Sequence, residues 1–196
     1  MSDHSIIDRP TNGPFMPEGP ARARGTRTIS VANQKGGVGK TTTAINLATG
    51  LAACGQSVLV VDLDPQGNAS TGLGISDYET DVYDVLIGGG RFDDVICHSE
   101  IPGLDVAPAS ADLAGAEIEL IDIPHREARL RETLAPVLGR YDYVLIDCPP
   151  ALGLLTINAL VAADSVLVPL QCEYFALEGM TRLMKSIERI RRAYNE

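Results

Sequence analysis

A glycine-rich stretch over residues 35–42, Lys-Gly-Gly-Val-Gly-Lys-Thr-Thr, constrains the fold of this chain more than any other feature. It follows the apolar run from Ile29 to Ala32, which predicts a buried strand, and precedes residues 43–48, whose apolar spacing is typical of a helix. A strand, a glycine-rich turn and a helix in this order are the context of a phosphate-binding loop. The alternative is a turn that only joins a strand to a helix.

The residue types in this stretch suit the binding of a nucleotide. Glycines let the backbone curl so that its N–H groups point at an anion, and the following helix adds the positive end of its dipole. Lys40 offers a positive charge for the β- and γ-phosphates, and Thr41 offers a hydroxyl ligand for Mg²⁺. The pattern departs from G-x-x-x-x-G-K-[ST], because Gln34 stands at the first glycine position. The predicted nucleotide-binding residues are Lys35, Gly36, Gly37, Val38, Gly39, Lys40, Thr41 and Thr42.

Composition narrows the class of protein. A chain of 196 residues with 45% hydrophobic residues is long enough to bury the core of one domain. It has no apolar run of about 18 residues, as a membrane-spanning helix would need, and its N-terminus lacks the apolar part of a secretory signal. We therefore expect a cytoplasmic protein with no membrane partner. The net charge of −10 disfavours binding of nucleic acid by bulk charge but leaves room for a local basic patch.

The four cysteines and three histidines form no metal-binding pattern. None of the cysteines stands in a C-x-x-C pair, and the histidines form no H-E-x-x-H sequence. A zinc site or a disulfide framework is therefore not expected, and reduced thiols are.

The N-terminal residues 1–25 are rich in proline and glycine and poor in apolar residues. They predict a disordered extension, followed by a domain over residues 26–196. Basic residues at the end of the extension (Arg22, Arg24 and Arg27) belong either to a solvated tail or to a contact with an acidic partner.

Strands and helices alternate along the domain. Apolar runs predict strands over 28–33, 57–62, 104–108, 141–147 and 165–170, and helical spacing predicts helices over 41–53, 81–87, 110–120, 126–138, 152–163 and 176–194. This order predicts an α/β fold, in which a mostly parallel sheet is flanked by helices on both faces. Ligands of such sheets bind at the carboxyl ends of the strands.

Three carboxylates stand at these predicted carboxyl ends. Asp62 and Asp64 follow the second strand, and Asp147 ends the fourth. Asp147 could hold Mg²⁺ through water or through Thr41, and the sharp turn after it, at residues 148–150, could move when the γ-phosphate leaves. One of Asp62 and Asp64 could approach the metal while the other faces the attacking water. The alternatives are a strand-end or helix-capping role for Asp147 and turn roles for Asp62 and Asp64.

Three segments, 33–42, 61–68 and 146–150, together resemble the ParA/Soj family of chromosome- and plasmid-partitioning ATPases, which have a P-loop with a deviant Walker A motif. Segments 113–117 and 171–179 also resemble the family, and the similarity runs from about residue 28 to residue 196. The family continues beyond the last predicted helix, so the resemblance implies a chain that is shortened at its C-terminal end. The missing part would supply contacts to the adenine base and basic residues that touch DNA.

The resemblance also implies roles for individual residues. Lys35 would be the signature lysine that reaches the phosphates of the partner in an ATP-bound dimer, while Lys40 and Thr41 would serve the nucleotide and Mg²⁺ within one subunit. Asp64 would position the hydrolytic water, Asp147 would be the Walker B aspartate, and Asp62 would lie in the same segment as Asp64. The implied catalytic residues are Lys35, Lys40 and Asp64, and the implied metal-binding residues are Thr41, Asp62 and Asp147.

The activity that the resemblance implies is a weak hydrolysis of ATP to ADP and phosphate, with ATP and Mg²⁺ as cofactors. A homodimer would form with ATP and bind DNA without sequence preference, and a ParB-type centromere-binding protein would stimulate hydrolysis. The protein would then be cytoplasmic and associated with the nucleoid. The last predicted helix has Arg182, Lys185, Arg189 and Arg192 on one face, for DNA or a partner or simply for solvent, and Leu177, Met180, Met184 and Ile187 on another.

Other functions use the same loop. A dethiobiotin-synthetase-like enzyme would need a basic or polar pocket for a carboxylate substrate, which the sequence does not reveal. An iron–sulfur reductase would need two cysteines near a dimer axis, for which Cys97 and Cys148 are available. A MinD-like membrane role would need an amphipathic C-terminal tail.

Overall fold

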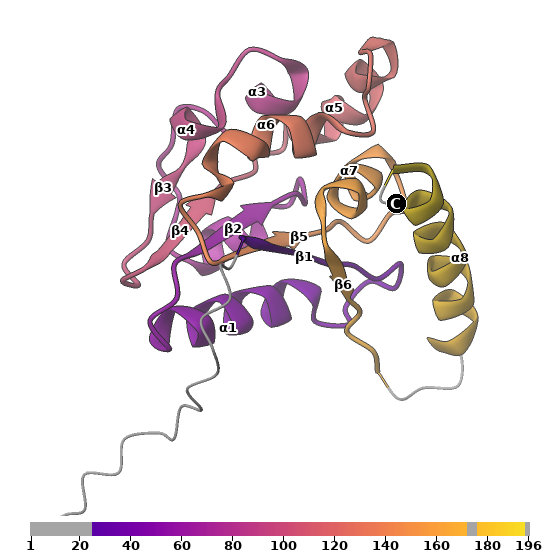
Figure 1. The fold of residues 1–196 in the computed structure, drawn as a ribbon, viewed down its shortest axis with the longest axis horizontal. Helices are drawn as coiled ribbons and strands as arrows, with labels where there is room; N and C mark the ends of the chain where they lie inside the picture. The colour runs from indigo at the N-terminus through magenta and orange to yellow at the C-terminus, as the bar shows by residue number, and fades with distance from the viewer. Residues whose placement is uncertain (1–24, 172–175, 195–196) are drawn as a thin grey trace, which may run out of the picture.

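A computed structural model describes residues 25–171 and 176–194, so the predicted extension lies outside the described residues except for Gly25 (Figure 1). Six strands of this part form one sheet in the order β3-β4-β2-β5-β1-β6. All neighbouring strands are parallel except β3 and β4. The strands are β1 (Arg27–Val31), β2 (Val58–Asp62), β3 (Cys97–His98), β4 (Leu104–Ala107), β5 (Tyr143–Asp147) and β6 (Ser165–Leu167).

Helices cover both faces of the sheet, which confirms the predicted fold class. Figure 1 shows α1 below the sheet and α3 to α6 above it, with α8 beside β6. The described helices are α1 (Lys40–Ala53), α2 (Asn68–Gly72), α3 (Val82–Ile87), α4 (Phe92–Val95), α5 (Leu113–Glu119), η1 (Leu120–Asp122), α6 (Arg129–Leu138), α7 (Leu154–Ala162) and α8 (Ala176–Tyr194). No helix of this part is long and apolar enough to cross a membrane.

The two faces of the sheet bury separate hydrophobic cores. In β2, Val58 and Val60 pack in the core that contains Ala48 of α1, whereas Leu59 and Val61 belong to the core under α3 to α7. These four side chains are all fully buried. The near-continuous apolar sequence of this strand therefore follows from a parallel sheet that is covered on both sides.

Short elements differ from the prediction. Pro65 and Gly67 do keep the residues after β2 out of a helix, but α2 begins directly behind Gly67, which adopts a left-handed conformation (φ 61°). The four-residue helix α4 and the two-residue antiparallel strand β3 were not expected either. Such short elements have too few residues for a periodic pattern, and their neighbours decide their conformation.

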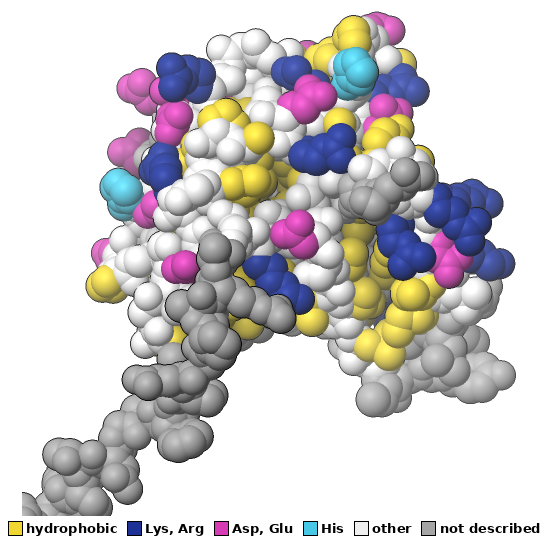
Figure 2. All heavy atoms as spheres, viewed as in Figure 1, with side chains coloured by type: hydrophobic (Ala, Val, Ile, Leu, Met, Phe, Trp, Pro, Cys, Tyr) yellow, Lys and Arg dark blue, Asp and Glu magenta, His cyan; other side chains and the backbone are white. Residues whose placement is uncertain are grey.

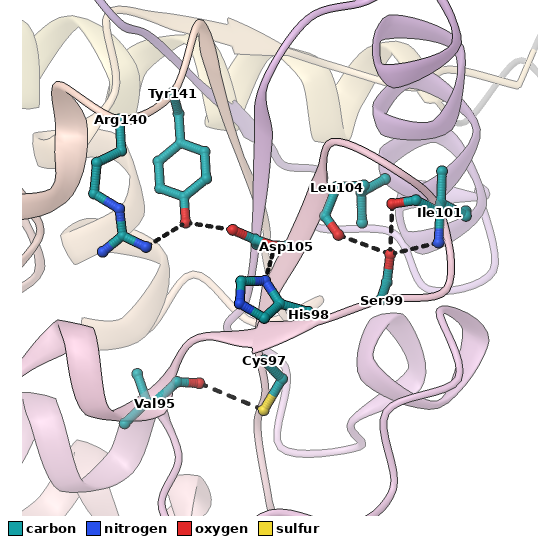
Figure 3. A network of polar contacts seen from close by, with 9 residues as sticks. All are labelled: Val95, Cys97, His98, Ser99, Ile101, Leu104, Asp105, Arg140 and Tyr141. Carbon is teal, nitrogen blue, oxygen red and sulfur yellow. Dashed lines mark hydrogen bonds and ion pairs between the residues drawn. The ribbon is translucent and has the colours of Figure 1, made fainter.

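A polar network links residues 140 and 141 to the strands β3 and β4, and β5 starts after these residues, at Tyr143 and not at residue 141 as predicted. Figure 3 shows Tyr141 directed toward β4, where its hydroxyl donates to Asp105 Oδ2 at 2.8 Å. His98 Nδ1 of β3 lies 2.7 Å from Asp105 Oδ1, and the guanidinium of Arg140 lies 5.5 Å from the centre of the Tyr141 ring. Burial and the bond to Asp105 raise the pKa of Tyr141, so this hydroxyl remains a donor.

The buried face of α8 is centred on Leu183, which the predicted apolar stripe omits. The side chain of Leu183 is 1% exposed, whereas Met184, a member of that stripe, is 47% exposed. Leu183 lies close to residues 32–34 and 149–152, so its side chain packs against the loops that follow β1 and β5. The side chain of Leu177 lies outside the described residues.

Candidate functional site

The glycine-rich loop lies at the carboxyl end of β1, between β1 and α1, as predicted. Gly37 and Gly39 have positive φ angles of 72° and 85°, which side chains other than glycine rarely adopt. The backbone N–H and the hydroxyl of Thr43 both donate to the carbonyl of Gly39, at 2.8 and 2.7 Å. Lys40, the first residue of α1, is buried.

The open side of this loop fits a bound phosphate. A Cβ atom added to Gly36, Gly37 or Gly39 would meet no described atom within 4 Å. Gly36 also has an ordinary backbone angle, so neither strain nor packing within the described residues accounts for its lack of a side chain. Close approach of a ligand to the backbone does account for it. The N-cap residue of α1, Gly39, has no side-chain cap among the described residues, which leaves the helix N-terminus to an anion.

Asp147 is a fully buried carboxylate whose partners do not lie among the described side chains. Neither of its oxygens has a hydrogen-bond partner there, and the Thr41 hydroxyl lies near enough to lower the pKa of Asp147. Burial raises the pKa of Asp147 to about 7, with Asp62 and Asp64 adding to the rise while Thr41 and Lys40 oppose it. Carboxylate and hydroxyl oxygens are the ligands that Mg²⁺ prefers, so Asp147 and Thr41 fit this ion.

Asp62 ends β2 directly beside Asp147 in the parallel pairing of β2 with β5. Its Oδ2 accepts from the backbone N–H and the hydroxyl of Ser70 at 2.8 and 2.7 Å, and its Oδ1 accepts from the N–H of Asp64 at 3.2 Å. Burial raises the pKa of Asp62, while these bonds act against the rise. Direct metal binding by Asp62 stays a prediction, and Oδ1, which accepts a single hydrogen bond, is the oxygen with acceptor capacity left for it.

Asp64 is held by a tight turn. Its Oδ1 accepts from the N–H of Gln66 at 3.0 Å, and its carbonyl accepts from the N–H of Gly67 at 2.9 Å. A Cβ atom on Gly67 would lie 2.9 Å from the carbonyl oxygen of Ala109, so glycine is required at this close approach. The turn places Asp64 on the same side of the sheet as Asp147, where the sequence predicts it.

Lys35 lies exposed at the mouth of the loop, and its side chain meets residues that follow β6. Its Nζ donates to Gln171 Oε1 at 3.4 Å, while Gln171 Nε2 donates to the carbonyl of Gly37 at 3.3 Å. Asn33 Nδ2 donates to the carbonyl of Pro169 at 2.7 Å. A cavity of about 200 Å³ is lined by Asn33, Gln34, Lys35, Val38, Leu170, Gln171 and Gly179.

Sequence reasoning assigned no role to two residues that the structure brings into this site. Ser70 binds Asp62 and also accepts from the N–H of Ala109, and Gln171 covers the glycine-rich loop. The sequence could have indicated that Gln171 lies near the site. It directly follows the last predicted strand, and the carboxyl ends of parallel strands meet at one edge of the sheet. Ser70 offered no comparable signal, since it lies in the unpredicted helix α2.

The two cysteines that an iron–sulfur reductase would use do not suit a shared cluster. Cys97 lies on the edge strand β3, whereas Cys148 is completely buried beside Asp147 in the middle of the sheet. Burial also raises the pKa of the Cys148 thiol, which disfavours the thiolate that a metal needs. Among the described residues, no three His, Cys, Asp or Glu side chains form a group that could hold a metal.

A parallel sheet with a glycine-rich loop at the carboxyl end of a central strand defines a P-loop nucleoside-triphosphate-binding fold. The family model described as an AAA domain matches residues 26–196. The chromosome partitioning protein ParA of Caulobacter vibrioides (strain NA1000 / CB15N) is 60% identical over 173 residues, which are 86% of this chain and 65% of the relative. The sporulation initiation inhibitor protein Soj of Bacillus subtilis (strain 168) is 53% identical over 171 residues, 86% of this chain and 68% of Soj. The chain belongs to the ParA/Soj family.

Solved structures agree with this fold. The cobyrinic acid a,c-diamide synthase from Mycobacterium smegmatis with bound ADP and magnesium is 42% identical, with a TM-score of 0.83 over 87% of this chain and 70% of that one. A plasmid partition protein from Borrelia burgdorferi is 29% identical, with a TM-score of 0.78 over 84% of this chain and 74% of that one. The chain thus spans about two thirds to three quarters of these relatives.

Proposed function

We propose that this chain is the ATPase of a partition system, which binds ATP with Mg²⁺ and hydrolyses it weakly to ADP and phosphate. The observation that carries the proposal is Asp147, a buried carboxylate with unpartnered oxygens beside Thr41 and the glycine-rich loop. An isolated buried charge is costly, and a metal ion would remove that cost. The names of the relatives, chromosome partitioning proteins, supply the process, and ADP with magnesium in the Mycobacterium structure supports the ligand.

In this mechanism, the backbone of residues 36–39 and the Lys40 ammonium hold the phosphates. Thr41 and Asp147 would hold Mg²⁺, with Asp62 beside them, and the ion would supply positive charge against that of the phosphates. Asp64 accepts a hydrogen bond from the attacking water and so aligns it with the γ-phosphorus. Positioning and charge stabilisation of this kind supply most of the catalysis of phosphoryl transfer.

The proposed partners are a second copy of the chain, DNA and a ParB-type centromere-binding protein. The ATP-bound homodimer would place Lys35 of each subunit on the phosphates of the other, bind DNA without sequence preference and release it after hydrolysis. Exposed basic residues of α8 support a contact with a polyanion. Such a protein would act in the cytoplasm on the nucleoid, with residues 26–196 as the ATPase domain.

Calorimetric titration with ATP and Mg²⁺ tests the nucleotide site. Lys40→Ala should remove measurable binding, because the buried ammonium offsets the charge of the phosphates, whereas Lys185→Ala on the exposed face of α8 should leave it intact. Phosphate release should be slow and should increase when DNA and a ParB-type protein are added. Equal ATP affinity of the Lys40→Ala protein and the unmodified protein would contradict the assignment.

A second candidate is a ligase for a small carboxylate, because the Mycobacterium structure carries the name of a diamide synthase. The higher identity to chromosome partitioning proteins favours the first proposal. A ligase should release phosphate from ATP only when a carboxylate acceptor and a nitrogen donor are present, and it should not respond to DNA. Stimulation by a ParB-type protein on DNA, without any acceptor, would exclude the ligase.

A further inference from the structure

The α5 helix reaches the loop behind Asp147 through one side chain. Glu117, in α5, directs its carboxylate at the N-terminal end of α7, where Oε1 accepts from the N–H of Leu155 at 3.5 Å. Leu155 is the second residue of α7, so its N–H has no acceptor within the helix. A carboxylate at this place also faces the positive end of the helix dipole.

Gly153 makes room for this contact. A Cβ atom at residue 153 would lie 2.7 Å from the carboxyl carbon of Glu117 and 2.9 Å from its Oε2, which is closer than real contacts allow. The backbone φ of Gly153, −93°, is one that alanine adopts without strain. A side chain at residue 153 and the observed position of the Glu117 carboxylate therefore exclude each other, which couples two residues from different elements. Gly153 is the N-cap residue of α7 and has no side chain that could cap the helix. Glu117 therefore acts in place of a local cap.

Residues 148–153 connect this pair to the proposed metal ligand. At one end, Cys148 follows Asp147, is completely buried and donates its N–H to the carbonyl of Val31 at 3.2 Å. At the other end, the hydroxyl of Thr156 donates to the carbonyl of Ala151 at 2.6 Å. The Glu117 carboxylate ties this second end to α5, in addition to Asn158 of α7, which donates to the carbonyl of Leu154 at 3.0 Å and accepts from the N–H of Leu130 in α6 at 3.0 Å.

We propose that Glu117 is a positioning residue, whose carboxylate holds the start of α7 and thereby fixes residues 148–153 behind Asp147. This inference rests on the proposed ATPase function, because it assigns Glu117 to the geometry of the same site. Loss of the contact lets the loop move relative to β5 and slows the chemical step, which depends on the alignment of metal, water and phosphate. Nucleotide binding depends mainly on the glycine-rich loop and changes little.

Two independent substitutions break the contact. Glu117→Ala removes the carboxylate, and Gly153→Ala displaces it, since the far end of a glutamate side chain can swing away. Both should lower kcat for ATP about tenfold with KM within about twofold, and should speed hydrogen–deuterium exchange in residues 153–156. The double variant should be no worse than either single variant, because the same contact is lost only once.

Glu119→Ala is the matched control. Glu119 lies on the same helix and accepts from the Tyr83 hydroxyl at 3.0 and 3.1 Å, away from residues 148–153. The Glu119→Ala substitution should change neither kcat nor the rate of hydrogen–deuterium exchange in residues 153–156. A purely structural role would appear as equal losses of stability in Glu117→Ala and Glu119→Ala with no change of kcat, and that result would overturn the inference, as would additive effects in the double variant.

The exchange measurement also separates the two proposals. If the unmodified protein hydrolyses no ATP, the proposed function fails, but faster exchange in both single variants and no further increase in the double variant would still establish the Glu117–Gly153 contact as the restraint on the loop. If ATP is hydrolysed and the three variants behave like the unmodified protein, the inference alone fails.

Discussion

Asp147 gives the site a dependence on pH that follows from burial. Its pKa is 3.8 in an unfolded chain and about 7 in the folded protein. Between these values the folded state keeps a proton that the unfolded state has lost, so the free energy of unfolding falls as the pH rises through this window. Asp62 also makes the free energy of unfolding fall as the pH rises, because burial raises its pKa as well. Without nucleotide, the protein should therefore be less stable at pH 8 than at pH 5 in respect of these two groups.

Asp147→Asn should raise the stability of the nucleotide-free protein at pH 8. The asparagine removes the buried charge, and each pKa unit corresponds to about 1.4 kcal/mol, so a gain of a few kcal/mol is expected that vanishes toward pH 4. Urea unfolding at pH 5 to 8 measures it, with the exposed Asp94→Asn as control. A stability difference that does not change with pH would contradict the raised pKa. In the presence of ATP and Mg²⁺, the unmodified protein should gain stability and the variant should not.

Asp64→Ala should retain ATP binding and lose turnover by roughly a hundredfold or more, since a group that orients water acts mainly in the transition state. Calorimetry and single-turnover phosphate release separate the two effects. Gln66→Ala is the control, because the turn uses the backbone of Gln66 and leaves its side chain exposed. Equal losses of binding and turnover in Asp64→Ala would assign Asp64 to the metal or to the fold.

Single residues could be placed from the sequence where a strand end fixed them. Asp147 ends a predicted strand, Lys40 and Thr41 follow the glycine-rich loop behind another, and the structure brings all three to the same edge of the sheet. The pairing of Lys35 with Gln171 could not be predicted in this way, because it depends on how the chain turns after β6. The same holds for Glu117 and Gly153, whose contact depends on the packing of α5 against α7.

Among the elements, α8 presents its basic face beside an apolar groove. Figure 2 shows basic side chains next to exposed apolar ones in this region. The groove, about 700 Å³ in volume, includes Val166 and Val168 near β6 and Met184, Ile187 and Ile190 of α8. Lys185 and Arg189, by contrast, point to solvent. The helix therefore separates an apolar from a basic surface, as its sequence predicts.

Replacement of Arg182, Lys185, Arg189 and Arg192 by alanine should weaken retention on DNA and reduce its dependence on salt. Each phosphate contact that is lost lowers the slope of log K against log salt by about 0.9. Binding to a DNA column or by fluorescence anisotropy at several salt concentrations measures this slope. The control is Glu188→Ala, which removes an opposing charge from the same helix and should strengthen retention. An unchanged slope in the fourfold variant would assign these residues to a solvated face.

Elements with a clear apolar pattern were predictable, including the short helix α3 and the strand β4, whereas α2, α4 and β3 were not predicted. The helix at 41–53 and the strand at 57–62 were predicted to within one residue at each end, because many residues repeat one pattern and α1 ends before Gly55 (φ 79°). In α8 the extent of the helix was predicted, and the predicted apolar stripe includes the half-buried Met180 and Ile187, but it omits Leu183 and contains the exposed Met184. The apolar periodicity of the helix allows either Met184 or Leu183 to face the core. Leu183 is the one that is buried, because it packs against the loops after β1 and β5.

At the scale of the whole molecule, the position of Lys35 bears on assembly. Its ammonium lies at the surface, 3.4 Å from Gln171 Oε1, while Lys40 already occupies the interior of the same loop. Two ammonium groups on one set of phosphates would repel each other by several kcal/mol at intermediate dielectric. An exposed lysine that meets the phosphates of a second subunit avoids this cost.

Lys35→Ala should therefore leave ATP binding largely intact and abolish ATP-dependent dimerisation. The variant is made in an Asp64→Ala background, in which ATP is not consumed. Sedimentation velocity with and without ATP reports the dimer, and Lys185→Ala in the same background should still dimerise. Dimer formation by the Lys35→Ala protein would refute the contact across the interface.

The place of β1 in the sheet governs the order in which this protein can be made. Among the described residues, the first strand to be synthesised is β1, which lies between β5 and β6, with Arg27 opposite Tyr143 and Ile29 opposite Ser165. Until those late strands are synthesised, both edges of β1 lack partners, and the loop behind it has no Asp147 beside it. The nascent chain therefore carries β1 with two open edges until β5 and β6 have been synthesised, and we expect the nucleotide site to form only after that point.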